Sequence, residues 1–244
     1  MPLTIPAFLN EGDTIGIFAP ARFAYEEQLN ETKNIIEQAG FSVKMGSNIG
    51  LRNQQFAGTD KERANALMEL TQDPQVKAII AARGGYGTAR ILEHLDLQIL
   101  KENPKWWIGF SDVTVLHLLS RWGLQQASIH GPVATTLQGN SNLFELLQGS
   151  EDWSFEASRI IHDETKFPIE PLPITGGNIS VIQSLLGSAS TRWNEPHILF
   201  LEDLDEMLYH LDRMLLGMEK SELFKHTLLH SHSPARSESV NCPR

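Results

Sequence analysis

Trp-Trp-Ile-Gly-Phe-Ser-Asp-Val-Thr, residues 106–114, is the most informative segment of this 244-residue chain. An apolar run over 106–110 predicts a buried strand, and the apolar spacing over 113–122 predicts a helix that begins at once. A serine at such a corner can project its hydroxyl into a crevice, while backbone N–H groups at the helix start point at the same space. Ser111 is therefore a candidate nucleophile for acyl transfer.

Strand-like and helix-like patterns alternate from the start of the chain to about residue 135. The expected strands are 14–19, 41–45, 76–82, 106–110 and one that begins over 127–130. The expected helices are 29–39, 61–71, 88–95 and 113–122. Such alternation implies an α/β fold with a mostly parallel, flavodoxin-like sheet and helices on both faces. Ligands bind beyond the carboxyl ends of such strands, so we expect the turns at 19–21, 83–87 and 109–112 to converge.

The second part of the chain has fewer clear elements. Residues 136–172 are weakly patterned, and they are followed by an expected helix at 179–186, a strand at 197–201 and a helix at 207–218. Apolar periodicity nearly vanishes after Leu229. We therefore expect an N-terminal α/β domain over 1–165 and an incomplete, truncated C-terminal domain over 166–244, with an irregular tail from about 222.

Charge and composition restrict the partners. Thirty acidic against twenty basic residues give a net charge of −10, which disfavours nucleic acid and anionic membranes. The chain contains no apolar run long enough to cross a membrane and no secretory signal at its N-terminus. Its single cysteine, Cys242, excludes an internal disulfide and fits a reducing compartment. These features predict a cytoplasmic protein.

The residues around Ser111 allow more than one interpretation. Ser111 can act simply as a helix cap, since serine is common at that position. The turn Arg83-Gly84-Gly85-Tyr86-Gly87 follows an expected strand, and its amides, together with the N–H of Asp112, are suited to bind the oxyanion of a tetrahedral intermediate. The same glycines also partly match a dinucleotide-binding fingerprint, although Arg90 replaces the last glycine, and a plain tight turn is the simplest alternative.

Candidates for the acid and the base are less distinctive. Glu202 ends an apolar strand and is either an orienting acid or a solvated strand end. His117 lies on the expected helix after Ser111, too far around it to face the hydroxyl. His130 ends a strand and either lines the crevice or is a hydrogen-bonded rim residue. His226, His230 and His232 have a spacing compatible with a metal, but a polar tail accounts for them better, and neither a metal nor a cofactor is expected.

Motifs through most of the chain resemble the LD-carboxypeptidase family of serine peptidases, which includes murein tetrapeptide carboxypeptidases and microcin C immunity proteins. The matching segments are Gly16-Ile17-Phe18-Ala19-Pro20, Phe56-Ala57-Gly58-Thr59-Asp60 with Arg63, Arg83-Gly84-Gly85-Tyr86-Gly87, Gly109-Phe110-Ser111-Asp112, Ile129-His130-Gly131-Pro132, Gly176-Gly177-Asn178, and Leu201-Glu202-Asp203 with Glu206 and Arg213. Together they extend from about residue 10 to 218.

The resemblance implies that Ser111 is the nucleophile and that Glu202 orients a histidine. It implies an oxyanion site made by backbone amides of the 83–87 turn, at Gly84 and Gly85, and of Asp112. It also implies hydrolysis of the amide before a C-terminal D-residue of murein peptides in peptidoglycan recycling, with no metal or cofactor, by a protein that is a homodimer when its C-terminal domain is complete.

The chain departs from the family in one respect. The family's histidine follows in a Gly-His turn well beyond the second-domain strand, and no Gly-His pair occurs after Glu202. We therefore expect a truncated or frame-shifted C-terminus and impaired catalysis, because serine without a base is a weak nucleophile. Two alternatives remain open at this point: a microcin C-type peptidyl-nucleotide hydrolase, and an inactive peptide-binding homologue.

Overall fold

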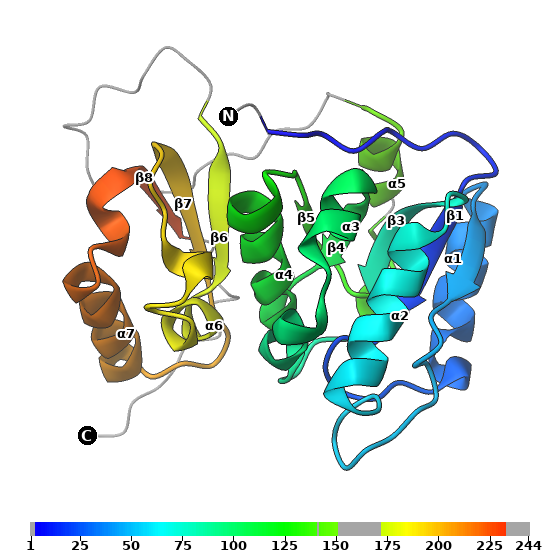
Figure 1. Ribbon diagram of the computed structural model, residues 1–244, viewed down its shortest axis with the longest axis horizontal. Helices are drawn as coiled ribbons and strands as arrows, with labels where there is room; N and C mark the ends of the chain where they lie inside the picture. Colours follow the sequence, from blue (N-terminus) through cyan, green and yellow to red (C-terminus); the bar gives the residue numbers. More distant parts are fainter. Residues whose placement is uncertain (1–2, 141, 151–171, 233–244) are drawn as a thin grey trace.

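The computed structural model describes residues 3–140, 142–150 and 172–232, and they contain two parallel sheets (Figure 1). The larger sheet consists of β1 (Thr14–Phe18), β2 (Ser42–Met45), β3 (Val76–Ala81), β4 (Trp106–Gly109) and β5 (Ile129–His130). Its strand order is β2-β1-β3-β4-β5, and every neighbouring pair is parallel. This is the flavodoxin-like order, so the predicted fold class is confirmed.

Helices cover both faces of this sheet, as the alternation predicts (Figure 1). α1 (Asn30–Gln38) and α5 (Asn142–Leu147) pack against one face, while α2 (Asp60–Gln72), α3 (Leu97–Glu102) and α4 (Thr114–Leu118) pack against the other. Successive strand residues point to opposite faces, so Ile80 belongs to the first core and Ile79 to the second.

Several helical segments are shorter than the periodicity predicts, or are wound more tightly or more loosely than an α-helix. The additional segments are the 3-10 helices η1 (Glu26–Leu29), η2 (Thr88–His94), η3 (Ser111–Val113), η5 (Ala134–Thr136), η6 (Ala189–Thr191) and η7 (Leu223–His226), and the π-helical η4 (Leu119–Leu124). The expected helix at 113–122 is thus divided among η3, α4 and η4. Apolar spacing cannot distinguish these windings, because all of them place one side of the segment against the sheet.

The smaller sheet consists of β6 (Ile174–Asn178), β7 (His197–Glu202) and β8 (Thr227–His232), in the order β6-β7-β8 with parallel pairing. α6 (Ile179–Ser184) and α7 (Leu208–Lys220) pack against it around a core that includes Ile182, Leu199 and Met218. Leu118 of α4 joins the same core. The two sheets are therefore packed together through α4.

Two strands of the smaller sheet were not expected from the sequence. The glycines of β6 lack the side-chain pattern of a strand, and residues after 222 form η7 and β8 where the sequence predicts an irregular tail. In both cases the backbone N–H and C=O groups pair with β7, which requires no apolar alternation. The expected boundary at 165/166 and the tail beyond 232 lie outside the described residues. Within the described ranges, no helix is long and apolar enough to cross a membrane.

Candidate active site

Ser111 occupies a strained backbone position at the carboxyl end of β4. It begins η3, is partly exposed, and has φ of 61°, in the left-handed region that non-glycine residues rarely adopt. Gly109 just before it has φ of 156°, and a Cβ there would lie 2.8 Å from Val113 Cγ2. A strained serine between a strand and a helix is the geometry of a nucleophile elbow, which keeps the hydroxyl accessible.

The glycine turn at 83–87 lies directly against this serine. A Cβ built on Gly84 would be 3.2 Å from Ser111 Cβ and 3.3 Å from its Oγ. In the part of the chain that the structure describes, the N–H groups of Gly84 and Gly85 donate to no protein acceptor. Asp112 lies in the first turn of η3, where N–H groups have no carbonyl partner within the helix. The corner therefore offers several backbone donors beside one hydroxyl.

Asp112 and Arg63 fix the glycine turn in place. The buried Asp112 Oδ2 accepts the Thr88 N–H at 2.8 Å, immediately after the turn. Burial raises the pKa of the Asp112 carboxyl, while its hydrogen bonds and the Arg63 guanidinium act in the opposite direction. Arg63 is completely buried and donates to the carbonyl oxygens of Gly87, at 2.8 Å, and of Pro20. The turns at 19–21, 83–87 and 109–112 thus converge.

Glu202 reaches the same region from the other sheet. It is the last residue of β7 and pairs with Asn178 of β6, whose N–H donates to Thr114 Oγ1 at 2.9 Å. Gly177 has φ of 136°, and a Cβ there would lie only 2.5 Å from Thr114 Oγ1. Only glycine permits this approach of β6 to α4, which begins three residues after Ser111. The contact joins the sheet that carries Glu202 to the helix that follows Ser111.

The Glu202 side chain is partly buried, and its carboxyl is incompletely hydrogen-bonded. Its Oε1 has no hydrogen-bond partner among the described residues, and the His130 Nε2 lies 3.9 Å away, beyond hydrogen-bond distance. Burial and the neighbouring Asp203 raise the pKa of Glu202, whereas a hydrogen bond from Asn178 lowers it. His130 sits at the end of β5, opposite Gly109 of β4, and its ring meets Phe200 edge-on at 5.0 Å. Burial, with His117 nearby, lowers the pKa of His130 to about 3.

His117 contacts the backbone just before Ser111. Its Nε2 lies 2.8 Å from the Gly109 carbonyl oxygen and its Nδ1 lies 2.9 Å from Ser128 Oγ. A carbonyl oxygen only accepts, so Nε2 carries the proton and Nδ1 accepts from the serine. Burial lowers the pKa of His117 to about 4, which keeps this tautomer neutral. As expected from the helical spacing, His117 is directed at the backbone rather than at the hydroxyl. Its contact with Gly109 was not foreseen.

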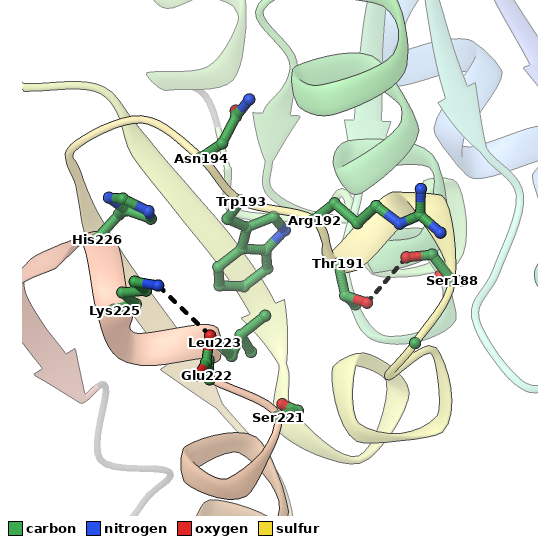
Figure 2. Close-up of a pocket in the computed structure, with 11 residues that line it drawn as sticks. Ser188, Thr191, Arg192, Trp193, Asn194, Ser221, Glu222, Leu223, Lys225 and His226 are labelled. Carbon is green, nitrogen blue, oxygen red and sulfur yellow. Dashed lines mark hydrogen bonds and ion pairs between the residues drawn. The ribbon is translucent and has the colours of Figure 1, made fainter.

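One cavity lies elsewhere, beside the smaller sheet (Figure 2). It has a volume of about 560 Å³ and is lined by residues of 187–188, 191–194, 221–223 and 225–226. Trp193 borders it but is only 6 % exposed and stacks on Trp122 with centroids 5.9 Å apart. Neither Ser111 nor Glu202 lines this cavity, so it is separate from the candidate active site. Among the described residues, no group of three or more metal-binding side chains is placed to hold an ion.

Comparison with known proteins adds family evidence to this geometry. The models described as LD-carboxypeptidase N-terminal domain and LD-carboxypeptidase C-terminal domain match residues 15–131 and 173–228. A probable murein peptide carboxypeptidase of Bacillus subtilis (strain 168) is 33% identical over 217 residues, which cover 86% of this chain and 68% of that relative.

Solved structures give the same result. Muramoyltetrapeptide carboxypeptidase from Oxalobacter formigenes superposes with a TM-score of 0.76 at 27% identity, covering 91% of this chain and 77% of that one. The microcin C7 self immunity protein MccF has a TM-score of 0.78 at 20% identity, covering 98% and 84%. At that identity, the second comparison supports the fold alone.

Proposed function

The chain belongs to the LD-carboxypeptidase family, and from this membership we propose that it is a serine carboxypeptidase acting on murein peptides. The reaction is hydrolysis of the amide before a C-terminal D-amino acid, as in peptidoglycan recycling. The observation that supports this most directly is the strained Ser111, with φ of 61° and its hydroxyl against Gly84. A helix cap does not require a left-handed serine, whereas a nucleophile elbow does.

In the proposed mechanism, Ser111 Oγ attacks the scissile carbonyl and forms a tetrahedral intermediate. Backbone N–H groups of Gly84, Gly85 and Asp112 stabilise the oxyanion, at about 3 kcal/mol for each donor. The hydroxyl proton passes through an imidazole to the leaving amine, and the D-amino acid departs. Water then hydrolyses the acyl-enzyme by the same steps in reverse order. Glu202 orients the imidazole and stabilises its charged form.

The rate that we expect depends on which imidazole acts as the general base. His130 is the imidazole nearest Glu202 in the described ranges, and its pKa of about 3 makes it a poor proton acceptor at neutral pH. Loss of the histidine from a serine triad costs up to about a millionfold in rate. We therefore propose that His130 in this arrangement supports only slow turnover, while the nucleophile elbow and its amide donors are retained.

The test measures release of D-Ala from L-Ala-D-Glu-diamino acid-D-Ala together with labelling of the protein by a serine-directed phosphonate. We expect slow labelling at Ser111, loss of that labelling and of any turnover in Ser111→Ala, and no change in Ser42→Ala, which alters an exposed serine on β2. D-Ala release that survives Ser111→Ala would refute the nucleophile. Peptide binding by a protein that neither turns over nor is labelled would favour the inactive peptide-binding homologue.

The microcin C-type alternative has weaker support. Hydrolysis of a peptidyl-nucleotide would be favoured by an aromatic platform for the base, but Trp193 is part of the core rather than an open surface. The likeness to MccF, at 20% identity, supports only the fold. The murein peptide substrate is therefore the one that we adopt.

Organisation and location are part of the same proposal. We assign 1–165 to an N-terminal domain and 166–244 to a C-terminal domain, and we propose a homodimer in the cytoplasm. Support for self-association comes from apolar side chains around the start of α7, where Leu204, Met207, Leu208 and Tyr209 are 59–84% exposed. Exposed apolar patches of this kind are typical of protein interfaces.

A further inference from the structure

Two arginines beside the glycine turn have no partner in the described part of the chain. Arg22 follows the turn at 19–21, and its Cγ and Cδ would lie 2.5 and 2.6 Å from a Cβ built on Gly85. Its aliphatic stem therefore rests on Gly85. Arg83 immediately precedes Gly84 and is half-buried. Within 3–140, 142–150 and 172–232, neither guanidinium makes a hydrogen bond or an ion pair.

The other arginines near this turn share a carboxylate partner. Arg63 forms an ion pair with Asp60, and Arg90 binds the same carboxylate at 2.8 Å. Together these side chains hold the pKa of Asp60 below its usual range. The chain as a whole carries ten more acidic than basic residues, so potential partners are plentiful. Arg22 is exposed and Arg83 is half-buried, and no nitrogen of either side chain is both buried and unpaired, so both guanidinium groups are accessible to an anion from outside.

The position of the pair fits one carboxylate of the substrate. The rest of this inference takes its substrate class from the proposed function. Gly84 lies against the Ser111 hydroxyl, which attacks the scissile carbonyl in the proposed mechanism. That carbonyl is therefore next to the 83–87 turn, and both arginines lie beside the same turn. In a carboxypeptidase substrate, the terminal carboxylate is attached to the Cα that follows the scissile nitrogen, within a few bonds of that carbonyl. Guanidinium groups match a carboxylate with paired, charge-assisted hydrogen bonds.

We propose that Arg22 and Arg83 bind the C-terminal carboxylate of the peptide and thereby restrict the site to the last amide bond. The Arg22 stem lies over Gly85, and Arg83 directly precedes Gly84 in the chain. Removal of either guanidinium weakens binding of the free acid without affecting a substrate whose terminus is already uncharged.

The experiment measures binding by titration calorimetry, so it does not depend on turnover. The ligands are L-Ala-D-Glu-L-Lys-D-Ala as the free acid and the same peptide with a C-terminal amide. We expect the wild-type protein to bind the acid about ten- to a hundredfold more tightly, the range for hydrogen bonds to charged groups. Arg22→Gln and Arg83→Gln should each remove most of that preference and leave binding of the amide unchanged.

Arg52→Gln is the matched control. It removes the same charge from a neighbouring segment, but Arg52 already donates to the Gln54 carbonyl oxygen and lies 4.6 Å over the Phe23 ring. It should leave both affinities unchanged. An equal loss of the preference for the acid in Arg52→Gln would show that positive charge in general, and not these two side chains, causes the preference, and it would overturn the assignment. The assignment would also be overturned if the wild type bound acid and amide equally or did not bind the acid. The same holds if the Arg22 and Arg83 variants bound both ligands equally more weakly.

Phosphonate labelling of Ser111 in the same proteins separates the two proposals. Acid-selective binding that depends on the arginines, without labelling, would refute the nucleophile and support the carboxylate site. Normal labelling without any preference for the acid would refute the carboxylate site alone.

Discussion

The contact between Gly177 and Thr114 makes a quantitative prediction about the junction of the two sheets. Gly177→Ala would place a Cβ 2.5 Å from Thr114 Oγ1 and 2.8 Å from its Cγ2, at φ of 136°. Backbone strain at such an angle costs about 1–3 kcal/mol, and overpacking a buried contact costs a further ~1–3 kcal/mol. We expect the free energy of unfolding to fall by about 2–6 kcal/mol, measured by urea denaturation.

Gly187→Ala is a matched control, because Gly187 also has positive φ, at 86°, but a Cβ there meets nothing within 4 Å. The loss of stability in Gly187→Ala should be limited to backbone strain. The difference in the free energy of unfolding between the two variants therefore measures the steric clash with Thr114. Thr114→Ala should by itself cost about 1–3 kcal/mol, since it leaves the buried Asn178 N–H without its acceptor.

The double variant Gly177→Ala, Thr114→Ala tests the cause of the loss. Removal of the threonine side chain makes room for the new methyl group, so the double variant should be more stable than the sum of the single losses predicts, by about 1–3 kcal/mol. Additive losses, or a Gly177→Ala variant no less stable than Gly187→Ala, would refute the inference that this close approach positions β6 against α4.

Three further predictions concern the elbow and its surroundings. Ser111→Gly and Ser111→Ala should both abolish phosphonate labelling, but the glycine variant should be the more stable by about 1 kcal/mol in urea, because glycine adopts φ of 61° without strain. Equal stabilities would contradict the strain. Asp112→Ala should cost about 1–3 kcal/mol or more by leaving the Thr88 N–H unpaired, whereas Asp112→Asn, which keeps an acceptor oxygen, should cost less; the reverse order would exclude this role. Stability should also fall as the pH drops from about 6.5 toward 3, because the pKa values of His117 and His130 are lowered to about 4 and about 3 and the unfolded chain binds their protons first. The free energy of unfolding should change by up to about 1.4 kcal/mol per pH unit for each histidine. In urea titrations at several pH values, His130→Gln should reduce this pH dependence by the share of one histidine. An unchanged pH dependence would show that His130 is not held neutral.

Local sequence patterns were sufficient to predict the main sheet and the strand-to-helix corner at Ser111. The buried strands at 14–18, 76–81 and 106–109 are largely apolar, and each is bounded by residues that end a strand. Once alternation with helices fixes parallel pairing, the carboxyl ends of the strands must lie at one edge. The convergence of Pro20, Gly84 and Ser111 follows from that rule, without knowledge of any tertiary contact.

Other parts of the site depend on contacts between residues far apart in the chain. Nothing local to Glu202 distinguishes it from a solvated strand end; its burial and its neighbours Asn178 and His130 arise only when the second sheet packs on α4. The fully buried Arg63 likewise finds its carbonyl partners 24 and 43 residues away.

By itself the sequence determined the order of the elements, the parallel sheet and the serine corner, because strand length, apolar periodicity and turn chemistry act over a few neighbouring residues. Only the tertiary structure decided that β6 and β8 are strands, that Gly177 faces Thr114, and that Glu202 of one sheet lies 3.9 Å from His130 of the other. Those outcomes depend on backbone pairing and close packing between distant segments, for which side-chain periodicity carries no signal.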